Sequence, residues 1–333
     1  MPDPGSIIFL VVAAALIFDF SNGWHDSANA IATVVSTKVL SPLQGVMMAA
    51  VLNFAGAFHG TAVAKTIGTD IADPTHVSQL VILVALFAAT SWNLLTQYLG
   101  LPSSSSHALI GGLVGAVVAS HGSGVLKAEG LVKVLSALLL SPMAGFAAGF
   151  ALMFLIYMVF ARTSPAMVNR IFGKAQIASA ALMAYSHGTN DAQKAMGIIT
   201  MALVAGGHLS SFAVPIWVIL CAASAMALGT ALGGWKIIKT LGVGMYHMKP
   251  VNGFAAETAA SFVLLSAAHV GAPVSTTHTI TSSIMGVGAA RRFSAVRWGI
   301  AGKILTAWIF TLPCTALLAA LLSLGLVALG FKL

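Results

Sequence analysis

Long apolar stretches separated by short polar islands dominate the chain. Those that approach or exceed the roughly 20 helical residues needed to cross a hydrocarbon core lie at 6–20, 43–64, 78–99, 131–160, 211–235, 255–270 and 298–330. Shorter apolar pieces lie at 108–120, 176–184, 195–206 and 279–290. The pattern predicts membrane-spanning helices combined with broken or re-entrant helices, whose free backbone groups must be satisfied by protein or by a water-filled cavity.

Composition supports an all-α integral membrane protein. Of 333 residues, 58% are hydrophobic and 7% are charged, whereas soluble domains contain about 25% charged residues. The first apolar stretch leads directly into a polar motif, with no basic segment before it, and we interpret it as a first span and not a signal peptide. The net charge of +8 comes from scattered basic residues, which argues against a nucleic-acid partner.

The polar islands are duplicated. NGWHDSANA, around Asp26, resembles HGTNDAQKA, around Asp191, and these aspartates lie 165 residues apart. PSSSSH, ending at His107, returns 171 residues later as PVSTTH, ending at His278. A third pair is GTAVAKTIG at 60–68 and GTALGGWKIIKTLG at 229–242, with an apparent insertion in the second copy. We predict a single transporter domain over 1–333, made of two repeats, 1–165 and 166–333.

The charges of equivalent connections have opposite signs. One basic and two acidic residues give the first connection a net charge of −1, and three basic residues give the second +3. These residues are Lys65, Asp70 and Asp73 in the first connection and Lys236, Lys239 and Lys249 in the second. Lys and Arg accumulate in cytoplasmic loops, so the repeats should have inverted topology, with an extracellular amino terminus and a site at the membrane midplane.

In helical form each aspartate motif presents one polar stripe. The first stripe contains Asn22, Asp26, Asn29 and Thr33, and the second contains His187, Asp191 and Lys194, with Asn190 and Gln193 beside it. A charged side chain at the centre of a membrane helix costs at least about 2.5–3.5 kcal/mol, so such residues usually line substrate or ion paths. The alternative is a buried aspartate paired with Lys194 for packing alone.

The motifs PSSSSH and PVSTTH have the residues of a helix N-terminus. Proline favours the first turn and Ser or Thr favours the N-cap, and a helix N-terminus attracts anions. Two such termini could converge on one anion, although ordinary capped helices would show the same residues singly. The candidate substrate ligands are Asp26, Asn29, Ser104, Ser105, Ser106, Asn190, Asp191, Gln193, Ser275, Thr276 and Thr277.

Aspartates beside an anion site favour phosphate over sulfate. Protonated phosphate has O–H groups that a carboxylate accepts, whereas sulfate has none. An anion facing two aspartates in a low dielectric also needs a compensating cation. Protons, sodium ions or a divalent metal bound to the phosphate would each meet that need.

Over essentially the whole chain these motifs resemble those of the inorganic phosphate transporter (Pit) family. The resemblance implies a multi-pass protein of the bacterial plasma membrane that takes up phosphate by symport, with no enzyme activity, cofactor or resident metal. The family's first motif often has Ala-Asn where this chain has Trp24-His25. Bacterial low-affinity members resemble this variant, and many of them use protons or carry a metal–phosphate complex.

A second departure concerns the coupling cation. Asn53 stands where many members have a glutamate, whereas Glu257 keeps an acid in the second half. The absence of an acid at position 53 argues against sodium as the coupling cation. His25, which could titrate near neutral pH, argues for protons. The candidate cation-coupling residues are Asn22, His25, Asp26, Asp191, Lys194 and Glu257. Asp19, seven residues before Asp26, stays an open candidate.

We therefore expect a secondary transporter for inorganic phosphate that works by alternating access. The alternatives are a permease for sulfate or another oxyanion and, more remotely, an intramembrane aspartyl protease with Asp26 and Asp191 as its dyad. The expected partners are phosphate, a coupling cation and the lipid bilayer. Close packing at Gly111, Gly112 and Gly115 would suit contacts within or between subunits, so a homo-oligomer is also open.

Overall fold

The computed structural model describes residues 4–333, and in these residues it consists of helices and connections, with no strand beyond one isolated bridge. The α-helices are α1 Pro4–Ser36, α2 Pro42–Gly56, α3 Ala62–Lys65, α4 Gln79–Leu99, α5 Ser105–His121, α6 Ala128–Val159, α7 Pro165–Ala205, α8 Ile216–Leu232, α9 Trp235–Lys239, α10 Pro250–His269, α11 Thr276–Arg291 and α12 Trp298–Ala328. In the described residues five helices are long and apolar enough to cross a membrane, or six if the bent pair α8 and α9 counts as one span.

Most predicted spans are confirmed, but the stretch 43–64 is broken into α2 and α3, and two further helices differ from the expectation. The pieces 176–184 and 195–206 belong to α7, one continuous helix of 41 residues. Likewise, α1 continues beyond the apolar stretch 6–20 and through the NGWHDSANA motif to Ser36. The polar residues that interrupt the apolar pattern are buried against other helices. The interruption of hydropathy therefore marks an internal polar site and not the end of a helix.

The breaks lie instead between α2 and α3 and between α8 and α9. The second pair bends by 61°. Side chains of the long helices satisfy the exposed amides: Ser27 Oγ accepts from the N–H of Gly234 at 2.5 Å, and Gln193 Oε1 accepts from those of Val63 and Ala64 at 2.8 and 3.1 Å. Each break leads into a short helix that ends in a π-helical turn, Thr66–Asp70 or Thr240–Gly244.

The structure also corrects the alignment of the third motif pair. A Cβ on Gly56 would lie 2.2 Å from the carbonyl oxygen of Tyr185, and one on Gly229 would lie 2.1 Å from that of Phe20. Tyr185 and Phe20 are 165 residues apart, like the two aspartates. Gly56 is therefore the counterpart of Gly229, and the apparent insertion shrinks from five residues to one, since Gly56 and Gly229 are 173 residues apart and Lys65 and Lys239 are 174 apart.

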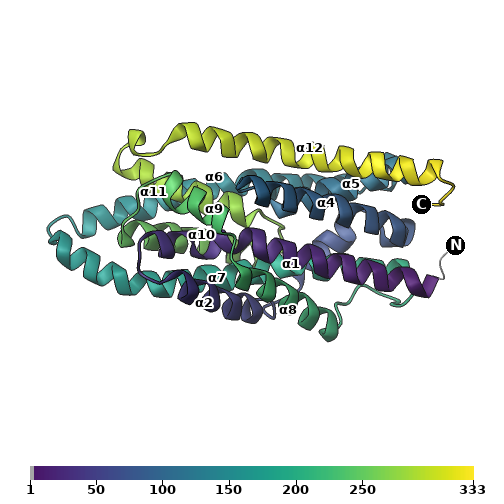
Figure 1. Cartoon of the computed structure of the whole chain (residues 1–333), viewed down its shortest axis with the longest axis horizontal. Helices are drawn as coiled ribbons and strands as arrows, with labels where there is room; N and C mark the ends of the chain where they lie inside the picture. Colours follow the sequence, from purple (N-terminus) through teal and green to yellow (C-terminus); the bar gives the residue numbers. More distant parts are fainter. Residues whose placement is uncertain (1–3) are drawn as a thin grey trace.

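Two helical hairpins carry the hydroxyl motifs to the centre of the bundle. Helix α5 packs against α4, and α11 packs against α10. Their tips touch, because Ser106 Oγ donates to the carbonyl of Val274 at 2.9 Å and the rings of His107 and His278 lie 4.6 Å apart. Figure 1 shows α5 running toward the end where the chain termini lie and α11 running toward the opposite end.

Equivalent helices make equivalent contacts and run in opposite directions. Helix α1 packs on α8 as α7 packs on α2, and α6 packs on α11 as α12 packs on α5. In Figure 1, α1 and α7 run antiparallel, as do α6 and α12. The bundle is therefore a pair of intertwined, inverted repeats with re-entrant hairpins, as the duplicated motifs and opposite charges predicted.

Candidate functional site

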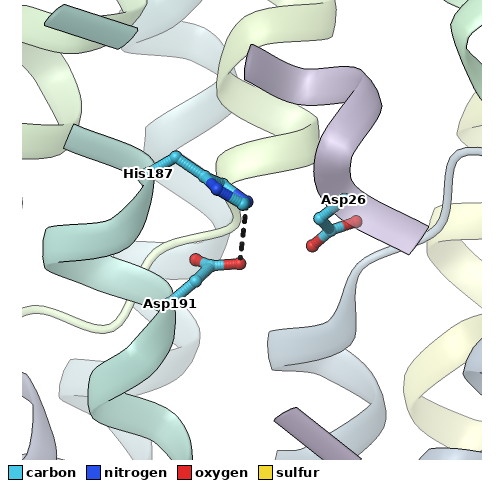
Figure 2. A group of neighbouring side chains, drawn as sticks. All are labelled: Asp26, His187 and Asp191. Atoms are coloured by element: carbon cyan, nitrogen blue, oxygen red, sulfur yellow. Dashed lines mark ion pairs between the residues drawn. The ribbon is translucent and has the colours of Figure 1, made fainter. Parts of the chain in front are cut away.

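Helices α1 and α7 place both aspartates at the centre of the bundle. Asp26 on α1 is 1% exposed and Asp191 on α7 is fully buried. Figure 2 shows them facing each other, with His187 one helical turn before Asp191 on α7. One ligand atom from each of these three residues lies within 4.8 Å of the others. The predicted convergence of the two aspartate motifs is thus observed.

A lysine and a serine connect the two aspartates on one side. Lys194 Nζ lies 2.8 Å from Asp191 Oδ2 and donates to Ser105 Oγ, also at 2.8 Å. Ser105 Oγ in turn donates to Asp26 Oδ2 at 3.0 Å. Ser105 of α5 and Lys194 of α7 therefore join the two aspartates through one hydroxyl group and one ammonium group.

Two threonines and an asparagine connect the aspartates on the other side. Thr277 Oγ1 donates to Asp26 Oδ1 at 3.1 Å, and Thr276 Oγ1 donates to Asp191 Oδ2 at 3.2 Å. Asn29 Nδ2 donates to both hydroxyls, at 2.9 Å to Thr277 and 3.3 Å to Thr276. This closes a hydrogen-bonded ring of seven residues, which we call the central ring: Asp26, Asn29, Ser105, Asp191, Lys194, Thr276 and Thr277.

The central ring is sealed from solvent, because each of its residues is at most 1% exposed. Donors of the ring bond to acceptors within it, but two acceptors of the ring and one acceptor beside it have no donor in the described part of the chain. Asn22 Oδ1, Asn29 Oδ1 and Asp191 Oδ1 are buried and have no hydrogen-bond partner among the described residues. Buried polar atoms without partners call for an explanation. Here the missing partner must be a hydrogen-bond donor or a cation.

Two further predicted residues flank the central ring. His25 Nδ1 lies 2.6 Å from Asp26 Oδ1, and its Nε2 lies 3.1 Å from Thr96 Oγ1. Asn22 Nδ2 donates to Asp191 Oδ2 at 3.4 Å. The two histidine nitrogens thus connect Asp26 to α4, while Asn22 connects α1 to Asp191.

The structure does not bring the remaining predicted substrate ligands to the central ring. Ser104 and Ser275 cap α5 and α11, where each side chain accepts from a histidine N–H three residues later at 3.2 Å. The Ser106 hydroxyl bonds the opposite hairpin. Asn190 donates to the carbonyl of Leu264 at 3.4 Å, and Gln193 caps α3. The last two lie one residue before and two residues after Asp191, which turns them away from its face.

Glu257 lies in a separate polar cluster between α1, α7 and α10. Its carboxyl accepts hydrogen bonds from Thr33, Ser179 and, at 3.3 Å, Gln176 Nε2. All four residues are buried. Thr33 lies one helical turn beyond Asn29 on the predicted stripe, so the stripe extends from the central ring to this cluster.

Asn53 and Glu257 are not counterparts, contrary to the sequence interpretation. Asn53 lies on α2, which matches α8, whereas Glu257 lies on α10, which matches α4. Asn53 donates to Thr230 Oγ1 at 2.8 Å and contacts His187 Nδ1 at 3.1 Å. At the 171-residue spacing the counterpart of Glu257 is Leu86, which is buried among apolar residues.

Sequence reasoning left one acid unassigned. Asp19 is fully buried, and neither carboxyl oxygen has a hydrogen-bond partner among the described residues. The signal was its spacing, since a residue seven positions before Asp26 lies on nearly the same helix face. Asp19 is thus a third acid beside the central ring.

Comparison with known proteins agrees with the motifs. Residues 22–319 match the model of the phosphate transporter family. Probable low-affinity inorganic phosphate transporters of Bacillus subtilis (strain 168) and Rhizobium meliloti (strain 1021) are each 50% identical to the chain; the first alignment covers 95% of this chain and 96% of the relative, the second 93% and 94%.

The solved structure of a sodium-dependent phosphate transporter superposes with a TM-score of 0.91 over 97% of this chain and 99% of that chain. At 22% identity this likeness speaks for the fold alone. The family match and the relatives exclude the protease alternative. The chain belongs to the phosphate transporter family and is a multi-pass membrane transporter, not an enzyme.

Proposed function

We propose that this chain takes up inorganic phosphate by proton-coupled symport and alternating access, with phosphate bound at the central ring. The observation that carries the proposal is the ring itself, in which hydrogen bonds link residues of both repeats while Asn29 Oδ1 and Asp191 Oδ1 remain without a donor in the described residues. Phosphate oxygens would accept from Lys194, Ser105 and Asn29. Its O–H groups would donate to Asp26 and Asp191 in place of the ring hydroxyls.

Charge balance supports a coupled cation. Lys194 and Asp191 form a neutral pair, which leaves Asp26 as the uncompensated carboxylate of the ring. A phosphate anion beside it in a buried site is unfavourable unless positive charge enters too. A proton is favoured over sodium because Asp26 already contacts His25, whose ring nitrogens can accept and donate a proton.

A divalent metal bound to phosphate is the alternative form of the cargo. Asp26, His187 and Asp191 offer a nitrogen and two carboxylate oxygens within 4.8 Å of one another. Such an ion would compete with Lys194, which lies 2.8 Å from Asp191 Oδ2. This competition makes the proton the simpler partner.

The hairpins supply a route for alternating access. They enter the bundle from opposite ends (Figure 1), and their tips contribute Ser105 from one hairpin and Thr276 and Thr277 from the other to the ring. Moving the α4–α5 tip would open one side, and moving the α10–α11 tip would open the other. We place the division between the repeats at residues 165 and 166, so that each repeat contributes one hairpin and one aspartate.

A permease for sulfate or another oxyanion is the second candidate. The unpartnered acceptors on Asn22, Asn29 and Asp191 disfavour sulfate, which has no hydrogen to donate. Both relatives described above carry names that refer to inorganic phosphate. Arsenate, which is protonated like phosphate, should compete with it.

Proteoliposomes provide the test. We expect labelled phosphate to accumulate when an inward proton gradient is imposed and not when only a sodium gradient is imposed. Unlabelled phosphate and arsenate should reduce uptake, and excess sulfate should not. Liposomes without protein are the control. Uptake driven only by sodium would reject proton coupling, and uptake unaffected by unlabelled phosphate would reject specific phosphate transport.

A further inference from the structure

Asp19 is the buried acid that the closed ring does not use. It lies on α1, and both of its carboxyl oxygens are buried without a hydrogen-bond partner among the described residues. Leaving an isolated carboxylate in a low dielectric costs so much that such groups bind a proton or pair with a cation. Packing alone does not explain an acid here, since a leucine or asparagine would fill similar space.

The charged surroundings of Asp19 come from one helix. The charged groups that act on it are Lys194 and Asp191, both on α7. Helices α4 and α8, which also pack against α1, contain no acidic, basic or histidine residue. Because the Lys194 ammonium is already bonded to Asp191 and Ser105, it does not compensate Asp19 by direct contact.

The position of Asp19 places it between the ring and the end of the bundle that carries the amino terminus. Seven residues along a helix correspond to about 10 Å, so Asp19 lies two turns from Asp26 on nearly the same face. The opposite charges of the connections assign that end to the extracellular side. A proton entering from outside would therefore reach Asp19 before the central ring.

We propose that Asp19 is the proton-binding residue that couples phosphate uptake to the proton gradient. This rests on the proposed proton symport. Open to the outside, the Asp19 carboxylate takes one proton from water, which removes one negative charge beside the central ring and lowers the repulsion that an entering phosphate anion meets. Open to the inside, the O–H bond breaks and the proton leaves to water with the phosphate. The carboxylate remains, and Lys194 and Asp191 stay paired throughout.

The geometry favours a proton over a sodium ion at Asp19. A sodium ion needs several oxygen ligands at once, whereas a proton can bind the Asp19 carboxyl group alone, whose two oxygens have no hydrogen-bond partner in the described residues. A proton needs one oxygen and no further ligand.

The test compares net uptake with exchange, because exchange does not require the coupling proton to leave. In proteoliposomes loaded with unlabelled phosphate, Asp19→Asn should exchange labelled phosphate at a rate within about threefold of wild type. Its proton-driven accumulation should fall to the equilibrium ratio of one. Asp19→Glu should retain accumulation. Ser21→Ala, which removes a neighbouring buried hydroxyl from α1, is the matched control and should retain both activities.

Each outcome decides the inference. The inference is overturned if Asp19→Asn accumulates phosphate at the wild-type level under a proton gradient. It is also overturned if both Asp19→Asn and Asp19→Glu lose exchange as well as accumulation, because Asp19 would then serve structure or phosphate binding. If wild-type protein shows sodium-driven uptake, the proposed function itself fails, and the Asp19 variants play no part in that result.

Discussion

The two aspartates occupy matching positions, yet their charges are balanced differently. Asp191 has a lysine one turn away in contact with its carboxyl group, whereas Asp26 has Asn29 at the corresponding position. Asp26 instead accepts from two hydroxyls and contacts His25. One repeat therefore has a fixed counter-charge and the other does not. The two half-sites are similar, and the difference between Asn29 and Lys194 gives a fixed counter-charge to only one of them.

Neutralising each aspartate separates these tasks most clearly. Asp26→Asn and Asp191→Asn should each lower phosphate uptake by about 10- to 100-fold or more, because each removes hydrogen bonds to a charged group. Only Asp191→Asn should also lower thermal stability, since it leaves Lys194 buried and unpaired, at a cost of about 3–5 kcal/mol. Proteoliposome uptake and thermal melting of the purified variants measure both effects. Equal melting temperatures, or wild-type uptake in both variants, would contradict this division.

Replacing Lys194 by asparagine, the residue at the matching position of the first repeat, tests the role of the fixed counter-charge. Lys194→Asn should lower uptake by about 10-fold or more and destabilise the fold, because Asp191 loses its charged partner. Combining it with Asp191→Asn should recover stability without recovering uptake, which a double-mutant cycle detects. If the double variant is no more stable than Lys194→Asn alone, the pair is not the source of the stability.

The Glu257 cluster has no polar counterpart, so a smaller effect is expected there. Glu257→Gln should lower uptake by about threefold to tenfold, consistent with weakening hydrogen bonds from Thr33 and Ser179. Leu86→Met, a change of similar volume at the matching position, should leave uptake unchanged. Uptake would be compared across pH 5–8. An unchanged rate and pH profile in Glu257→Gln would remove this residue from coupling.

The capping residues should show the smallest effect. Gln193→Ala leaves two amides at the start of α3 without their acceptor, and Ser27→Ala leaves one at the start of α9. Each change should cost about 1 kcal/mol of stability, more for Gln193, while the KM for phosphate stays the same. A large rise in KM for Gln193→Ala at unchanged stability would instead support its predicted role as a substrate ligand.

The duplicated motifs were sufficient to predict the centre of the molecule. Residues that repeat at matched spacing and share a helix face, such as Asp26 with Asn29 and Asp191 with Lys194, do meet in the structure. Hydropathy was less reliable for α7, because a helix whose polar face is buried by protein need not be apolar. Hydropathy therefore indicated two short apolar pieces where the structure has one helix of 41 residues.

The motifs could not predict which hydrogen bonds the individual hydroxyl and amide side chains make. Ser104 and Ser105 are adjacent and chemically identical, but one caps α5 and the other bonds Asp26 and Lys194. Which of them faces the centre depends on where the helix starts, and helix starts are uncertain by one or two residues from sequence. Asp19 could not be assigned from the sequence because its distinguishing feature, a buried carboxyl group without a hydrogen-bond partner in the described residues, is visible only in the structure.

The most direct test of the central ring is equilibrium binding of labelled phosphate to the purified protein, with arsenate and sulfate as competitors. We expect saturable binding that arsenate displaces and sulfate does not, and we expect this binding to be lost in Asp26→Asn while the protein stays folded. Displacement by sulfate as effective as by unlabelled phosphate, or unchanged binding in Asp26→Asn, would contradict the ring as a site for protonated phosphate.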